Sequence, residues 1–227
     1  MKYPVPKIYC LGDSAMTIEF GVGIDEDVNQ LAIACADQLD KTRFPGFIEA
    51  APAYASTTVF FDPFQVYSEI GDHSRIRDHV RERIMLAAAA TVETCPSIGR
   101  SVEIRTRFGG EFGPDLTELA ARCGISESDV IEAFINREYR VFMLGFLPGF
   151  AYMGKVDERI AVPRRDVPRR SVPSGSIGIA DDQTGIYPFD SPGGWQLIGR
   201  TDIKVFDKEN VPPYFFSPGD RVRFVPA

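Results

Sequence analysis

Histidine and tryptophan are scarce in this chain of 227 residues, which holds two histidines and one tryptophan. With only His73 and His79 available, a histidine-rich metal site is nearly excluded, and we predict no metal site. Cysteine is also sparse, and no two cysteines form a CxxC motif. This favours reduced thiols in a cytoplasmic protein. The cysteines are Cys10, Cys35, Cys95 and Cys123.

Long apolar runs and an excess of basic residues are missing as well. The longest apolar candidate, residues 85–90, is far shorter than the ~18 residues that a membrane span needs. The first residues lack the apolar core of a signal peptide. The net charge is −7, which disfavours non-specific binding to nucleic acid. We therefore expect neither a membrane nor a nucleic acid among the partners.

The first part of the chain alternates predicted strands and helices. Strands are expected at residues 15–20, 46–50, 56–61 and 102–107, and helices at 25–42 and 73–90. This order is typical of a ferredoxin-like α/β domain, which we place at residues 1–93. The strand at 102–107 is also compatible with the domain that follows.

Residues 94–227 have a different texture. A linker is expected at 95–99 and helices at 114–123 and from Ser126 onward. Residues 141–227 contain 10 of the 20 glycines and 10 of the 17 prolines, with short β-type runs between them. Such density of turns predicts a closed or nearly closed β-barrel. These runs are 140–146, 176–180, 196–199, 203–206 and 221–225. The fold class is therefore α+β, with an α/β domain followed by a barrel domain.

A glycine-rich turn, GGEFGPD at 109–115, joins a predicted strand to a predicted helix. Such a turn can present backbone N–H groups to an anion, but it lacks the spacing of a P-loop or a dinucleotide fingerprint. A tight turn with Pro114 at the first helical position is the simpler interpretation. Glu111 favours a functional role, because no helix cap requires a carboxylate between these glycines.

The segment 144–154, LGFLPGFAYMG, interleaves glycines with aromatic residues. Gly149 would let the backbone approach a ligand, and Tyr152 would wall a pocket. A barrel corner packed by its own aromatics is the equally weighted alternative.

An arginine cluster lies within residues 159–170 of this acidic chain. Guanidinium groups bind carboxylate or phosphate in a fork geometry, so Arg164 and Arg165 are candidates for anion binding. For most of the cluster, a solvated loop with ion pairs is the simpler interpretation.

The segment 173–201 combines uncharged polar side chains with turn glycines and the only tryptophan. This composition favours a pocket for a small polar ligand, although a series of hairpin turns would have it too. Ser174 lacks both a G-x-S-x-G context and a neighbouring histidine, so a Ser–His triad is not expected. The candidate residues are Ser174, Gln183, Thr184, Tyr187, Gly193, Gly194, Trp195 and Gln196.

These stretches together resemble one family. GGEFGPDL, YRVFMLGFLPGFAYMG, PSGSIGIADDQTGIYP and SPGGWQLIGRT are similar to the signature of the B-type subunits of 5-oxoprolinase. The family is also called allophanate hydrolase subunit 1 and includes the Kip-type sporulation kinase inhibitors. LGDSAMTIEFG, AYASTTVFFDP and SPGDRVRFVP extend the resemblance over nearly the whole chain. Phe108, Ser174 and Asp181-Asp182 depart from the residues that are common in the family.

The resemblance implies a cyclophilin-like β-barrel at residues 94–227. It also implies two partners, a homologous C-type subunit and an A-type subunit of 5-oxoprolinase. Together the three would open the lactam of 5-oxoproline to glutamate. The cofactor implied is ATP with its accompanying Mg²⁺, in a site on this chain or on a partner.

Lactam hydrolysis needs cations or N–H donors for charged oxygens and a group that moves a proton. From residue types, we expect catalytic roles for Glu111, Tyr152 and Tyr187. The expected substrate-binding residues are Gly149, Arg164, Arg165, Ser174, Gln183, Thr184, Gly193, Gly194, Trp195 and Gln196.

Three alternative functions stay open. The resemblance is equally compatible with an inhibitor that binds a sensor histidine kinase. Another small amide, such as urea or allophanate, would also suit the polar pocket. Prolyl isomerase activity would follow from the barrel fold alone, and a fold does not define a function.

Overall fold

The computed structural model describes residues 6–91 and 99–227, and the chain divides into two compact units, 1–98 and 99–227. The domain boundary predicted at 93/94 and the linker with Cys95 lie outside the described residues. Each unit has its own hydrophobic core.

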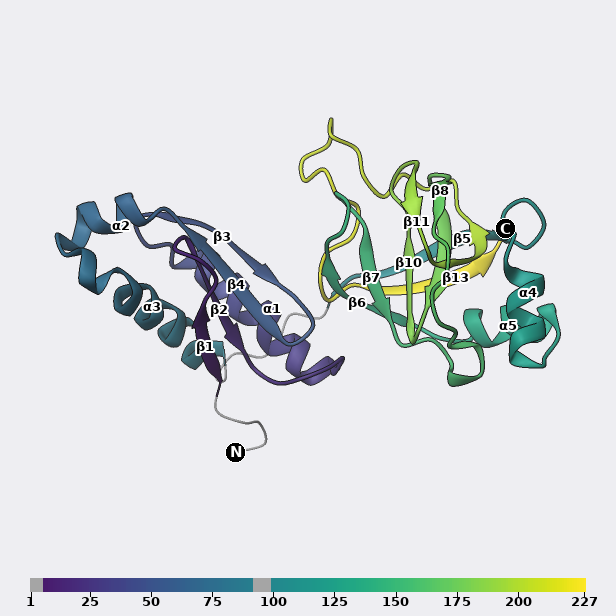
Figure 1. Ribbon diagram of the computed structural model, residues 1–227, viewed down its shortest axis with the longest axis horizontal. Helices are drawn as coiled ribbons and strands as arrows, with labels where there is room; N and C mark the ends of the chain where they lie inside the picture. The colour runs from purple at the N-terminus through teal and green to yellow at the C-terminus, as the bar shows by residue number, and fades with distance from the viewer. Residues whose placement is uncertain (1–5, 92–98) are drawn as a thin grey trace. The chain divides into compact units, whose positions relative to one another are not determined.

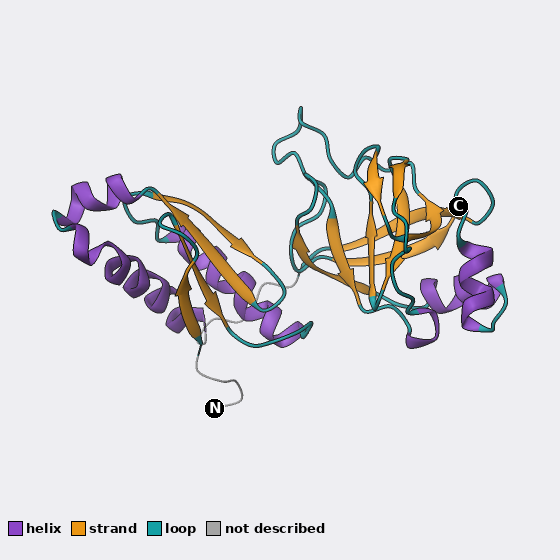
Figure 2. Ribbon diagram, viewed as in Figure 1, coloured by secondary structure: helices purple, strands orange, loops and turns teal. Residues whose placement is uncertain are grey.

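The first unit is a four-stranded antiparallel sheet with helices (Figures 1 and 2). Its strand order is β1-β2-β4-β3. The strands are β1 (Lys7–Cys10), β2 (Ala15–Glu19), β3 (Phe47–Pro52) and β4 (Ser56–Phe61). The helices are α1 (Glu26–Lys41), α2 (Pro63–Ile70), the 3-10 turn η1 (His73–Arg75) and α3 (Ile76–Thr91).

Alternation along β2 and β4 explains this core. Met16 pairs with Val59 in the register, so both side chains lie on the face that α1 covers. Thr57, on the same face, donates a 2.7 Å hydrogen bond to the carbonyl of Ala32 in α1. Asp25 caps the N-terminus of α1, because its side chain accepts a hydrogen bond from the backbone N–H of Val28.

The second unit is built on a closed seven-stranded barrel in the order β10-β7-β6-β13-β5-β12-β9. The predicted closed barrel is therefore confirmed. The barrel strands are β5 (Ser101–Phe108), β6 (Tyr139–Leu144), β7 (Ala151–Gly154), β9 (Ser176–Ala180), β10 (Gln183–Ile186), β12 (Gln196–Arg200) and β13 (Arg221–Pro226). A separate two-stranded sheet pairs β8 (Arg169–Val172) with β11 (Ser191–Gly193).

Two helices, α4 (Leu116–Cys123) and α5 (Glu127–Ile135), pack beside the barrel with the 3-10 turn η2 (Glu158–Ile160) (Figure 1). Ser126 and Asp129 form the predicted capping box of α5. Gly124 ends α4 in the left-handed conformation, as predicted.

The strand predicted at 102–107 belongs to the barrel, not to the first sheet. As β5 it pairs in parallel with β13 and antiparallel with β12. The edge of the first sheet beside β2 is occupied instead by β1, whose alternation is too short to stand out in the sequence.

Two predicted elements were wrong in detail. The helix predicted at 114–123 begins only at Leu116, because Asp115 is its N-cap residue and Pro114 precedes the helix. The strand predicted at 203–206 is not a strand, and only the isolated bridge between Phe206 and Tyr214 remains of it. The backbone after β12 continues into a long loop, in which Val205 is buried without a neighbouring ladder.

Among the described residues, no helix has both the length and the apolarity that crossing a bilayer requires. The described part of the chain also holds no group of three histidine, cysteine or acidic side chains placed to bind a metal ion. Cys10, Cys35 and Cys123 are free thiols.

Candidate functional site

Four aromatic side chains meet in the barrel unit and form what we call the aromatic cluster. Its members are Phe150, Tyr152, Tyr187 and Trp195. Phe150 lies at the centre, with ring centroids 4.9 Å from Tyr152, 5.4 Å from Tyr187 and 5.3 Å from Trp195. All these contacts are edge-to-face, the favoured arrangement of aromatic pairs. The cluster thus unites two sequence motifs that are about 40 residues apart.

Arg164 adds a positive charge to this cluster. Its guanidinium carbon lies 5.9 Å from the centre of the Trp195 ring, within the range of a cation–π contact. Arg164 is exposed, so its charge is available to a ligand from solvent. The same charge acts on both tyrosines of the cluster.

Both tyrosine hydroxyls are held in the protonated form. Burial raises the pKa of Tyr152 above the ordinary phenol value, and the charge of Arg164 offsets only part of that rise. Burial likewise raises the pKa of Tyr187, against a backbone hydrogen bond from Trp195 and the charge of Arg164. At neutral pH the two phenols are therefore hydrogen-bond donors, and neither is a ready base.

Gly193 lies too close to another side chain to carry a side chain of its own. A Cβ at Gly193 would lie 2.3 Å from the Tyr187 hydroxyl, so only glycine lets that hydroxyl approach the backbone here. The Gly194 carbonyl accepts a 2.7 Å hydrogen bond from the backbone N–H of Arg165. Together these contacts hold the predicted SPGGW segment against the arginine segment.

Asp115 also holds the arginine segment, residues 159–170, in place. Its side chain is 3% exposed and accepts hydrogen bonds from Arg165, at 2.9 Å, and from Arg169. It also accepts a 2.6 Å hydrogen bond from the backbone N–H of Leu197 in β12. The carboxylate therefore joins three segments that are distant in sequence: the glycine-rich turn, the arginine segment and β12.

Gln196 completes this anchoring. Its side-chain amide donates a 3.2 Å hydrogen bond to the carbonyl of Pro163, directly before Arg164. The residues on both sides of Arg164 are held by hydrogen bonds, Pro163 by Gln196 and Arg165 by Asp115 and Gly194. These bonds help to place Arg164 over Trp195.

Sequence reasoning missed Asp115 and Arg169 as members of this site. Both stood inside recognised motifs, but an acidic residue at a helix start is ordinarily a cap. The arginine cluster at 159–170 has few carboxylates near it in the sequence, so an acidic residue elsewhere had to pair with it. Asp115 was a candidate for that partner. Phe146, one of the aromatic residues of the segment 144–154, is exposed, has φ of 68°, and its ring lies 5.5 Å from that of Phe150.

Several predicted residues have structural partners elsewhere. The Thr184 hydroxyl is buried and donates to the carbonyl of Gly178 at 2.9 Å. Ser174 closes a turn, with its hydroxyl donating to the Pro188 carbonyl at 3.0 Å. Gly149 packs against the backbone of Val205 and Phe206, where a Cβ would lie within 2.9 Å of the Val205 carbonyl oxygen. Gln183 is half-buried in β10.

No described contact joins Glu111 to the aromatic cluster. Glu111 is exposed in the turn and makes no hydrogen bond or ion pair with a described residue. The ring of its neighbour Phe112 contacts the guanidinium groups of Arg107 and Arg200. A proton-transfer role for Glu111 stays a prediction.

The glycine-rich turn uses four of its backbone N–H groups within the fold. The N–H groups of Gly109 and Asp115 bond the carbonyls of Ile198 and Leu197, and those of Phe112 and Gly113 bond the Gly109 carbonyl. These four donors are used within the fold, which favours a structural turn, and a functional role of the turn stays a prediction.

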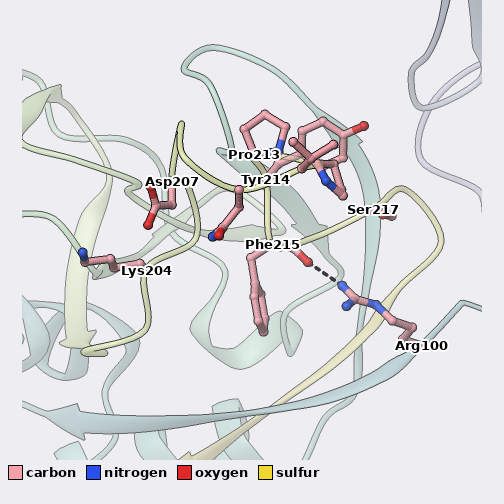
Figure 3. A pocket seen from close by; sticks show the side chains of 10 residues that line it. Arg100, Lys204, Asp207, Pro213, Tyr214, Phe215 and Ser217 are labelled. Atoms are coloured by element: carbon pink, nitrogen blue, oxygen red, sulfur yellow. Dashed lines mark hydrogen bonds between the residues drawn. The ribbon is translucent and has the colours of Figure 1, made fainter.

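A cavity of about 340 Å³ lies under the long loop after β12 (Figure 3). In that view Arg100 donates to the backbone carbonyl of Phe215, and Lys204, Asp207 and Tyr214 surround the opening. None of the predicted site residues lines this cavity.

The chain that carries this barrel and candidate site matches a known class of proteins in sequence. The chain belongs to the family of the carboxyltransferase domain, subdomain C and D, whose model matches residues 6–216. It is 46% identical to the B-type subunit of 5-oxoprolinase from Bacillus subtilis (strain 168), over 95% of this chain and 90% of that protein. The resemblance predicted from the motifs is therefore confirmed.

Solved structures of other proteins have the same fold as this chain. The crystal structure of TTHA0988 has 35% identity and a TM-score of 0.79, covering 95% of this chain and 40% of the longer TTHA0988 chain. The K. lactis urea amidolyase has 18% identity and a TM-score of 0.75, covering 98% of this chain and 15% of that protein. The second likeness shows the shared fold alone.

Proposed function

We propose that this chain is the B-type subunit of an ATP-dependent 5-oxoprolinase, which hydrolyses 5-oxo-L-proline to L-glutamate together with a C-type and an A-type subunit. The observation that carries the proposal is the 46% identity to the B-type subunit of 5-oxoprolinase across 95% of the chain. On this proposal the chain is inactive alone, because its site supplies recognition groups but no positioned base.

The aromatic cluster with Arg164 is the proposed substrate site. The Arg164 guanidinium binds the carboxylate of 5-oxoproline through its fork of donors. The rings of Trp195 and Tyr152 cover the apolar part of the five-membered ring. The hydroxyls of Tyr152 and Tyr187 donate hydrogen bonds to the lactam oxygen, where negative charge develops when water attacks the carbonyl carbon.

ATP dependence is part of the proposal, although four N–H donors of the glycine-rich turn are used within the fold and the turn lacks the spacing of a P-loop. We therefore propose that the nucleotide binds outside this turn, on this chain or on a partner subunit.

We further propose that the two units are ferredoxin-like and cyclophilin-like, respectively. The first assignment is supported by an antiparallel sheet with α1 and α3 packed together on it. The second is supported by the closed barrel of seven strands.

The test is ATP-dependent glutamate formation from 5-oxoproline, measured with the chain alone and with the C-type and A-type subunits added. We expect activity only in the full mixture, and a Glu111→Gln variant tests the proton role of that residue. No turnover in a mixture shown to be assembled would contradict the proposal and favour the kinase-inhibitor or alternative-amide functions.

A further inference from the structure

Three arginines gather on the outer side of the barrel, where β5 and β12 pair. They line a cavity of about 480 Å³. Arg107 and Arg200 are direct cross-strand partners. Arg105 precedes Arg107 by two residues, so its side chain lies on the same face of β5.

Two of these guanidinium groups share one aromatic ring. The guanidinium carbon of Arg107 lies 4.2 Å from the centre of the Phe112 ring, and that of Arg200 lies 4.9 Å from it. Like charges directly opposite each other on a sheet repel and destabilise the pair. The ring of Phe112 holds the two cations in place despite that repulsion, through cation–π contacts.

Glu103, Asp202 and the last residue, Ala227, also line the cavity, and the two acidic side chains neutralise only part of the charge of the three arginines. Asp202 forms an ion pair with Arg107, but its side chain is 83% exposed. Glu103 forms no ion pair with a described arginine. The guanidinium groups of Arg105 and Arg200 make no hydrogen bond or ion pair with any described residue. The cavity therefore has two guanidinium groups with free donors, in a chain whose net charge is −7.

We propose that Arg105, Arg107 and Arg200 form a binding site for a phosphate group, carried by a nucleotide or present as a free phosphate. Guanidinium groups match the oxygens of phosphate in a fork geometry, and a dianion suits several cations better than a single carboxylate does. Neither Asp115 nor any member of the aromatic cluster lines this cavity, and the proposal does not rest on the lactam-hydrolase function.

Binding to the full chain tests this site without any turnover. The probes are inorganic phosphate, pyrophosphate and ATP, titrated at low salt and followed by calorimetry and by the arginine Nε–H signals in ¹H–¹⁵N spectra. We expect saturable binding that shifts the Arg200 signal and weakens with added salt. Tighter binding of pyrophosphate and ATP than of phosphate would identify a polyphosphate ligand, and equal binding would identify a single phosphate group.

The variants Arg105→Gln and Arg200→Gln are each expected to weaken binding about tenfold, the loss of one charge-assisted contact. Arg122→Gln, which removes an exposed arginine from α4, is the control and should bind as the unaltered chain does. Circular dichroism checks that each variant is folded. The proposal is overturned if none of the three probes binds saturably, or if both variants bind with unchanged affinity.

Discussion

Asp115 is buried yet surrounded by donors, since two arginines and the backbone N–H of Leu197 converge on one carboxylate. A buried charge is tolerated only where such partners replace water. The same contacts fix the segment that carries Arg164. Asp115 therefore acts on the proposed substrate site through the position of its neighbours, without touching the aromatic rings.

Replacing Asp115 with asparagine is expected to destabilise the folded chain by about 2–4 kcal/mol, because two partly buried guanidinium groups lose their counter-charge. Urea unfolding followed by circular dichroism measures the loss. Asp202→Asn is the matched control, since its ion pair with Arg107 is largely exposed, and little change is expected there. Equal stability of the two variants would show that the buried network contributes nothing.

The tyrosines give a pH-dependent prediction. The pKa of Tyr139, Tyr152 and Tyr187 is raised, by burial first in each case. The folded state therefore holds these protons more tightly than the unfolded state does. Stability from this source is complete below the ordinary phenol pKa of about 10 and falls as the pH rises above it.

A spectrophotometric titration at 295 nm should show a group of tyrosines that ionises above pH 10, the last of them together with unfolding. Tyr139→Phe and Tyr187→Phe should each reduce this late group. Ionisation of all eight tyrosines in one step near pH 10, while the chain stays folded, would contradict the burial that the structure shows.

At the scale of elements, strand alternation and the capping pattern were reliable signals. The strand at Ser56–Phe61 and the capping box at Ser126 appear where they were predicted. The helix after the glycine-rich turn begins later than predicted, because tertiary contacts of Asp115 replace its local cap. Such contacts link residues about 50 and 80 positions apart, and no local pattern reveals them.

The short sheet of β8 and β11 was missed for a related reason. Both strands hold only three or four residues, and β11 contains Pro192, which ordinarily argues against a strand. The proline is tolerated in a two-stranded sheet because one side of each strand has no ladder to complete. This sheet nonetheless carries Arg169 and Gly193, which both contact the site.

The glycine pair at the end of β11 gives a test at this scale. Gly193→Ala would place a Cβ 2.3 Å from the Tyr187 hydroxyl, so the ring must move and the variant should lose about 1–3 kcal/mol of stability. Gly194→Ala is the control, because its nearest contact would be an ordinary 3.6 Å. Trp195 is the only tryptophan, so its fluorescence during urea unfolding reports on this location. A smaller effect at Gly193 than at Gly194 would contradict the packing.

At the scale of the whole molecule, the sequence motifs predicted a barrel and the family, and they named most of the residues that meet at the site. Tyr152, Arg164, Tyr187 and Trp195 come from three separate motifs, and the structure brings them together. Spacing could not distinguish them from Thr184, whose hydroxyl serves the barrel instead. Which polar side chain faces a ligand depends on the closure of the barrel, which is a property of the entire unit.

The most direct measurement is the steady-state kinetics of 5-oxoproline hydrolysis by the assembled complex containing Arg164→Gln. If Arg164 binds the substrate carboxylate, the KM for 5-oxoproline should rise about tenfold or more. Arg170→Gln, an exposed arginine of β8, is the control and should leave KM unchanged. A KM within twofold of the unaltered complex for Arg164→Gln, with the complex intact, would contradict the assignment of the aromatic cluster as the substrate site.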